Sequence, residues 1–205
     1  MEEIIRKLEL YLLNTTDFRY KELIRSYFKL FFESYDKLGK EDYLGKETPE
    51  ETFSSNLCFQ HVDDRYFPTC FLIKPLASKA RRMGKFIPIT SDIVPHIILN
   101  VCESRKKTPT ANSPIILMSY FNDYICLDGN HRLQSAFEQG NQAYGYVLKW
   151  EMTNSSDFFS KYDYYNFLLV WTYPLVECFC QQIYSEGIEA AFQSLLSDIK
   201  RKLTD

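Results

Sequence analysis

The segment from 114 to 140 constrains the fold of this 205-residue chain more than any other part of its sequence. Two apolar runs, 114–120 and 124–127, flank an Asn-Asp pair, which is the pattern of a β-hairpin. The second run leads into the pentapeptide DGNHR, Asp128–Arg132, after which apolar residues recur at helical spacing as far as Gly140. A hairpin that continues directly into a helix predicts an α+β domain.

Hydrophobic periodicity and turn residues predict the elements on either side of this segment. In chain order these are helices at 2–13 and 17–38, a polar connection at 39–56, a short strand at 69–73, a basic loop as far as Lys85, a helix at 92–102, a loop at 103–113, a strand at 144–150 and helical residues at 157–203, broken near Pro174 and Gly187. We therefore expect an N-terminal helical segment (1–56), an α+β core with a small mixed sheet (57–150) and an aromatic-rich C-terminal helical segment (151–205) that packs on the core.

The composition is that of a globular protein without a membrane span. Hydrophobic residues make up 45% of the chain and aromatic residues 16%, which argues against disorder. The most apolar run, 167–180, contains Pro174 and Glu177 and is too short to cross a bilayer. The first residues, Met-Glu-Glu, do not resemble a signal peptide, so we expect a cytoplasmic protein.

The spacing of the cysteines does not predict a zinc site. No CxxC pair occurs, and the Cys178/Cys180 pair has no histidine close to it in the sequence. We expect reduced, largely buried thiols at all six positions: Cys58, Cys70, Cys102, Cys126, Cys178 and Cys180.

Positive charge is concentrated in one stretch of a mildly acidic chain. Residues 74–107 contain eight basic and two acidic side chains, whereas the whole chain has a net charge of −3. Such a stretch suits either a phosphate-bearing ligand at a local site or a solvated basic loop. The acidic C-terminal segment argues against duplex DNA as a partner.

The pentapeptide DGNHR has the parts of an anion-binding site. A glycine between a strand and a helix lets the backbone approach a ligand, and the N–H groups of the helix start favour an anion. His131 and Arg132 add side-chain donors, and Asp128 can orient one of them or bind Mg²⁺. A capped helix, in which these polar groups only satisfy the backbone, is the competing interpretation.

The sequence around this turn resembles the ParB/sulfiredoxin superfamily. The resemblance is carried by "PIILMSYFNDYICLDGNHRLQSAFEQGNQAYGYVL" (114–148) and, less specifically, by "FLIKPLASKARRMGK" with "ITSDIVPHIILNVCES". It covers about residues 66–150. It implies a small mixed sheet with helices that binds a nucleoside triphosphate, ATP or CTP, together with Mg²⁺.

The resemblance also implies roles for individual residues. Gly129 and Asn130 would offer backbone N–H groups to phosphate, His131 and Arg132 would grip it, and Asp128 would hold the metal or orient His131. Asp128, His131 and Arg132 would be the catalytic residues. A second clamp on the polyphosphate would come from the basic stretch, at Lys79, Arg81 or Arg82.

Departures from the family pattern make some of the family's activities less compatible with this sequence. The reductase branch has its catalytic cysteine where this chain has Asn130, so sulfiredoxin chemistry is disfavoured; Cys126 is expected in the core. The kinase branch needs a base, for which Asp92, Glu103 or Glu138 would have to serve. We expect a Mg²⁺-dependent nucleotide hydrolase or phosphotransferase; the alternatives are a non-catalytic nucleotide sensor and a ParB-like nuclease.

Three further groups of residues are candidates of lower specificity. His61 and the run 63–65 (Asp-Asp-Arg) could serve a metal or as a base, or form a solvated loop. His96 is expected to be a partly buried structural histidine on the helix predicted at 92–102. The aromatic run 150–184 suits packing against the N-terminal helices, or a protein partner or homodimer contact.

Overall fold

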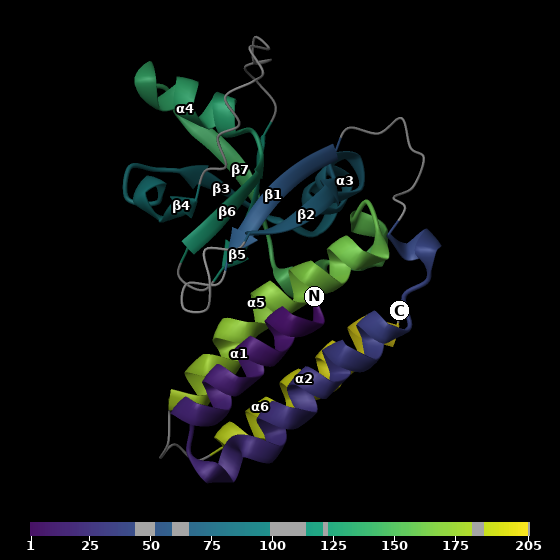
Figure 1. Ribbon diagram of the computed structural model, residues 1–205. Helices are drawn as coiled ribbons and strands as arrows, with labels where there is room; N and C mark the ends of the chain where they lie inside the picture. Colours follow the sequence, from purple (N-terminus) through teal and green to yellow (C-terminus); the bar gives the residue numbers. More distant parts are fainter. Residues whose placement is uncertain (44–51, 59–65, 99–113, 121–122, 182–186, 205) are drawn as a thin grey trace. The chain divides into compact units, whose positions relative to one another are not determined.

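The computed structural model describes residues 1–43, 52–58, 66–98, 114–120, 123–181 and 187–204 (Figure 1). The chain divides into two compact units. The helical unit comprises Met1–Lys46, Leu57–Thr69 and Ser160–Asp205, and the α/β unit comprises Glu47–Asn56 and Cys70–Phe159. The protein is therefore of mixed α and β structure, as the sequence predicts.

The helical unit is built from both ends of the chain. Its elements are α1 (Glu2–Thr15), η1 (Phe18–Tyr20), α2 (Lys21–Asp36), η2 (Lys40–Asp42), α5 (Lys161–Gln181) and α6 (Ile188–Thr204). Helix α2 contacts α1, α5 and α6, so it lies at the centre of the unit. The two predicted N-terminal helices are confirmed.

Aromatic residues of α5 pack against α2, as predicted: the ring centroids of Tyr173 and Phe28 are 6.4 Å apart, and those of Tyr162 and Tyr35 are 5.9 Å apart. The hydroxyl groups of Tyr27 and Thr172 lie 2.9 Å apart, and the hydroxyl of Tyr35 donates to Oδ1 of Asn166 at 2.8 Å. Tyr27, Asn166 and Thr172 are completely buried. These bonds satisfy polar groups that would otherwise destabilise an aromatic interface.

The predicted break at Pro174 is wrong, because α5 continues through it. Proline removes one helical hydrogen bond, but Tyr173 and Val176 on either side are almost fully buried, and their packing outweighs this loss. The break at Gly187 is confirmed: this residue has φ +88° and directly precedes α6.

The α/β unit contains a mixed five-stranded sheet in the order β3-β7-β5-β6-β4. The strands are β3 (Lys85–Ile89), β4 (Ile97–Ile98), β5 (Ile115–Tyr120), β6 (Asp123–Asp128) and β7 (Ala143–Leu148). The predicted hairpin is confirmed, since β5 and β6 are antiparallel; β7 is parallel to β5 and antiparallel to β3. Strands β1 (Thr52–Cys58) and β2 (Tyr66–Leu72) form a separate two-stranded sheet.

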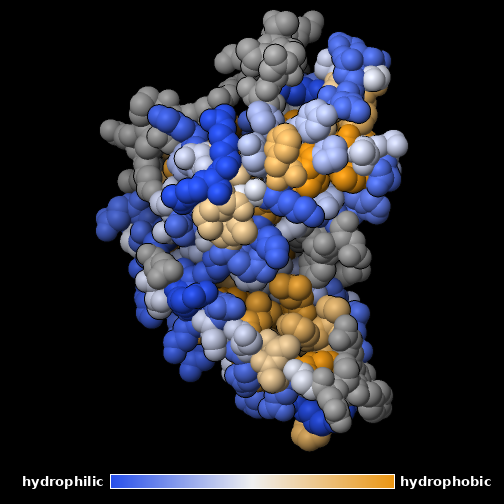
Figure 2. Space-filling view, turned by 180° about the vertical axis from the view of Figure 1, so that it is seen from behind, coloured by the Kyte–Doolittle hydropathy of each residue, from blue (hydrophilic) through white to orange (hydrophobic). Residues whose placement is uncertain are grey.

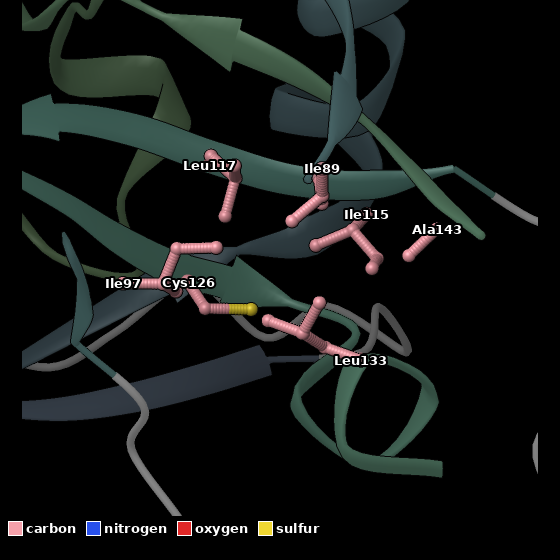
Figure 3. Close-up of a cluster of buried hydrophobic side chains, with 7 residues drawn as sticks. All are labelled: Ile89, Ile97, Ile115, Leu117, Cys126, Leu133 and Ala143. Carbon is pink, nitrogen blue, oxygen red and sulfur yellow. The ribbon is translucent and has the colours of Figure 1, made fainter. Parts of the chain in front are cut away.

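One face of the five-stranded sheet packs against helix α4 (Asn130–Glu138). Leu133 of α4 meets inward-facing residues of five strands, and Figure 3 shows these side chains converging. The cluster comprises Ile89, Ile97, Ile115, Leu117, Cys126, Leu133 and Ala143. Gly140, with φ +67°, ends the helix as predicted, and the Asn141 N–H donates to the Ala136 carbonyl at 2.8 Å.

Three predictions in the α/β unit are wrong. Residues 73–83 form helix α3 (Ile73–Met83) rather than a basic loop. The connection predicted at 39–56 contains the start of β1. The helix predicted at 92–102 is replaced by a turn, η3 (Val94–His96) and β4, because Pro95 and the β-branched Ile97 and Ile98 favour extended backbone. Residues 99–113 lie outside the described part of the chain.

On the face shown in Figure 2, hydrophilic side chains predominate and hydrophobic side chains are exposed in separate groups. Among the described residues, the large exposed hydrophobic side chains are those of Leu10, Phe18, Tyr43, Met83, Phe86 and Tyr144. None of the described helices combines the length and the hydropathy that a membrane crossing requires.

Candidate functional site

The DGNHR turn joins the end of β6 to the start of α4, and Gly129 makes the junction. Gly129 has φ +101° and ψ +17°, a left-handed conformation that side chains disfavour. A Cβ at this position would lie 2.9 Å from Cγ1 of Ile115 and 3.1 Å from Nη2 of Arg132. Glycine is therefore required at position 129 for two reasons: the backbone has a left-handed conformation, and neighbouring side chains occupy the space that a Cβ would need.

Arg132 is held over this turn by Asp128. Its Nη2 donates to Oδ2 of Asp128 at 2.8 Å, and the two side chains are 15% and 35% exposed, respectively. The pair is four residues apart and connects the last residue of β6 with the first turn of α4. Arg132 is thus a restrained, partly buried cation at the start of a helix.

The first turn of α4 keeps polar groups available for a ligand. The N-cap residue is Gly129, which has no side chain with which to cap the helix. The first intrahelical bond, from the N–H of Leu133 to the carbonyl of Gly129, leaves the preceding N–H groups outside the helical pattern. Oδ1 of Asn130 is buried and has no hydrogen-bond partner within the described structure, and His131 is exposed.

Cys126 lies two residues before the turn and belongs to the core, as expected. Its side chain is fully buried, and the Sγ donates to the Asp128 carbonyl at 3.5 Å. Burial, assisted by the negative charge of Asp128, raises the pKa of the Cys126 thiol to about 12. The thiolate is therefore scarce at neutral pH, and Cys126 is no substitute for a catalytic cysteine.

The structure does not bring the predicted basic clamp to the turn. Lys79 pairs with Asp157 of η5 (Ser155–Asp157), and both side chains are largely buried. Arg81 and Arg82 are exposed in the last turn of α3. Figure 1 shows α3 well separated from α4, so Lys79, Arg81 and Arg82 do not add their charges to those of His131 and Arg132 in the turn.

The remaining candidates lie away from the turn or outside the described residues. His96 is exposed rather than partly buried, and its Nδ1 lies 2.9 Å from Oδ1 of Asp123, at the opposite end of β6 from Asp128. Asp92 and Glu138 are exposed, and Glu138 accepts a bond from Gln134. Residues outside the described part of the chain are His61, Asp63, Asp64, Arg65 and Glu103.

The residues at the turn do not form a metal site by themselves. The described residues contain no cluster of three or more His, Cys, Asp or Glu side chains. Asp128 is a single carboxylate whose Oδ2 already accepts from the Arg132 guanidinium, a cation that repels a second cation. The donor set among the described residues therefore does not fit a resident Mg²⁺.

Two residues that contact the predicted site residues were not singled out from the sequence. Ile115 supports Gly129 across the sheet, and Asp157 neutralises Lys79 from 78 positions away. The Asn154–Asp157 capping box could have indicated a turn, since Oδ2 of Asp157 accepts from the Asn154 N–H. Nothing local, however, indicates that this carboxylate also binds a lysine of α3.

No family model, curated protein or solved structure matches the chain.

Proposed function

We propose that the turn from Asp128 to Arg132 binds the phosphate groups of a nucleotide, ATP or CTP, in a domain of the ParB/sulfiredoxin type. The observation that carries the proposal is the pairing of an uncapped helix start with a restrained guanidinium over Gly129. N–H groups at a helix N-terminus attract anions, and a guanidinium binds phosphate through two donors.

Each residue of the turn has a role in this proposal. Gly129 has no side chain that would block the approach of a phosphate to the backbone N–H groups. Arg132 supplies the main positive charge, and the exposed His131 reaches an outer phosphate oxygen. The buried Oδ1 of Asn130, which has no partner within the described structure, would accept a hydrogen bond from a donor group of the nucleotide. Asp128 holds Arg132 while no anion is bound, and a phosphate then competes with it for the guanidinium.

Nucleotide binding is the part of the expected function that these contacts support best. Hydrolysis, phosphoryl transfer and phosphodiester cleavage would each need a positioned base or a metal with its own ligands. Nucleotide sensing needs the binding site and a conformational response to binding, but no base or metal. We therefore propose nucleotide sensing as the role of the turn. Turnover of the bound nucleotide would instead show that the protein is an enzyme.

The test compares two arginine variants that differ in their surroundings. Arg132→Gln removes the guanidinium at the turn. Arg201→Gln removes the guanidinium of an exposed pair on α6, in which Nη2 of Arg201 lies 2.9 Å from Oδ1 of Asp198. Affinity for ATP, CTP and GTP is measured by calorimetry with and without Mg²⁺, together with thermal melting and product formation.

We expect nucleotide to raise the melting temperature of the wild type and of Arg201→Gln, and affinity to fall at least tenfold in Arg132→Gln. Absence of binding by the wild type, or equal affinity in all three proteins, would reject the proposal. Release of inorganic phosphate or cleavage of an added oligonucleotide would assign a hydrolase or a nuclease to the same turn.

A further inference from the structure

An exposed row of aromatic rings crosses two strands of the α/β unit. Phe86 on β3 and Tyr144 on β7 are parallel within 4°, with ring centroids 5.7 Å apart, and Phe86 also contacts Tyr146 at 5.0 Å. Phe86 is 52% exposed and Tyr144 is 43% exposed. We call Phe86, Tyr144 and Tyr146 the aromatic row.

The row lies on the sheet face opposite helix α4. Side chains alternate along a strand, and Ile89 and Ala143, which are register partners, belong to the core beneath α4. Phe86 and Tyr146, also register partners, therefore face the other way. Strand β3 is outermost in the strand order of the described sheet, so the row lies at its edge.

The segment that leads along the chain into the row carries basic residues and no acidic ones. Helix α3 and β3, joined by Gly84, carry four exposed basic residues, and no Asp or Glu occurs between Arg65 and Asp92. The exposed basic residues are Lys74 in the first turn of α3, Arg81 and Arg82 in its last turn, and Lys85, whose side chain alternates to the other face of the sheet from that of Phe86. Nη2 of Arg82 lies 3.8 Å from Sδ of Met83, itself exposed and three residues from Phe86.

We infer that the aromatic row and the basic end of α3 bind single-stranded nucleic acid. Exposed rings on a sheet offer faces on which bases stack, and neighbouring cations neutralise the phosphates. A duplex hides its base faces, so the row would not recognise it. A protein partner would have to supply its own carboxylates to pair Arg81 and Arg82, whereas a nucleic-acid strand carries a negative charge at every phosphate. The inference does not depend on the Asp128–Arg132 turn.

The experiment measures binding of fluorescein-labelled twelve-nucleotide dT and rU strands to the full chain by anisotropy, with a duplex of equal length for comparison. The Phe86→Leu/Tyr144→Leu variant keeps apolar side chains but removes the stacking faces. Phe18→Leu is the matched control, because Phe18 of η1 is an even more exposed ring, at 79%, in the helical unit. Circular dichroism and melting temperature establish that each variant is folded.

We expect the wild type and Phe18→Leu to bind single strands more tightly than duplex, and the double variant to bind at least about tenfold more weakly. In Arg81→Gln/Arg82→Gln, the slope of log affinity against log salt should decrease by about 1.4, or about 0.7 for each lost contact. Absence of single-strand binding, or an unchanged affinity in the Phe86/Tyr144 variant, would overturn the inference. Self-association of the wild type that this variant abolishes, without oligonucleotide binding, would instead assign the row to a second copy of the chain.

Discussion

The guanidinium of Arg132 lies over the α-carbon of Gly129, so closely that a Cβ on residue 129 would come within 3.1 Å of Nη2 and 3.3 Å of Nε. The same guanidinium is bonded to Asp128. The position of the main cation of the proposed site therefore depends on the absence of a side chain three residues earlier. The backbone conformation of Gly129, the space above its α-carbon and the position of the Arg132 charge therefore depend on one another.

Gly129→Ala is predicted to destabilise the protein and to displace Arg132. The left-handed backbone costs an alanine about 1–2 kcal/mol, and the clash with Ile115 adds about 1–3 kcal/mol. Gly140→Ala is the matched control, since Gly140 also has a positive φ but a Cβ there would meet no atom within 4 Å. Urea denaturation should give a clearly larger loss for Gly129→Ala. Equal losses would mean that the turn relaxes around the methyl group.

Lys79 is predicted to stabilise the fold rather than to bind nucleotide. Lys79→Met leaves the carboxylate of Asp157, which is 1% exposed, without its cation, at a cost of about 3 kcal/mol. Lys74→Met, on the exposed face of α3, should change stability by less than about 0.5 kcal/mol. Nucleotide affinity, measured under conditions in which both variants are folded, should stay within twofold of the wild type.

A large loss of affinity in Lys79→Met without a loss of stability would restore Lys79 to the phosphate clamp that the sequence suggested. The double variant Lys79→Met/Asp157→Asn provides a second measurement. Because the two side chains interact directly, its destabilisation should be smaller than the sum of the two single changes by at least about 1 kcal/mol.

The fold could be predicted where the hydrophobic pattern and the turn residues of one segment indicate the same structure. From Ile115 to Gly140, strand alternation, helical spacing and glycines at both helix ends indicate the same structure, and the hairpin and α4 are correct. Helix α3 was missed because Pro75 and the basic residues suggest a loop. A proline in the first turn is nevertheless compatible with a helix, and Leu76 and Ala80, four residues apart, are buried.

At the candidate site, the sequence predicts only those contacts whose residues are close together along the chain. Asp128, Gly129 and Arg132 are close in sequence, so their association follows from the turn itself. The separation of α3 from α4, and the pairing of Lys79 with Asp157, depend on how distant segments pack. The clustering of basic residues in the sequence therefore indicated a basic surface. It did not indicate that Lys79, Arg81 and Arg82 lie away from the turn.

Stability is predicted to fall as the pH rises above about 10. Burial raises the pKa of Tyr27, Tyr35 and Tyr173 well above the usual value, so these phenols stay protonated in the folded state while they ionise in the unfolded state. The unfolded state then binds fewer protons, and each tyrosine costs about 1.4 kcal/mol per pH unit above 10. Below pH 9 this contribution to stability is fully retained. Urea midpoints at pH 8, 9, 10 and 11 measure the slope.

Tyr35→Phe tests the origin of that slope. The variant should lose about 1 kcal/mol at neutral pH, because the bond to Asn166 is gone, and should lose less additional stability than the wild type between pH 10 and 11. Tyr144→Phe is the control, since its hydroxyl bonds Gln142 at the exposed surface. A slope that Tyr35→Phe leaves unchanged would exclude Tyr35 as a contributor.

Cys126 is predicted to resist alkylation in the folded protein. With a pKa of about 12 in a fully buried site, it presents roughly one thiolate in ten thousand molecules at pH 8, and reagent reaches it only after opening of the core. The exposed Cys178 is the internal reference. Peptide mapping after iodoacetamide treatment should show Cys178 modified at least about a hundredfold faster, and both at similar rates in urea. Rapid native modification of Cys126 would mean that the junction of β6 and α4 opens readily, which contradicts a preformed, restrained site at the turn.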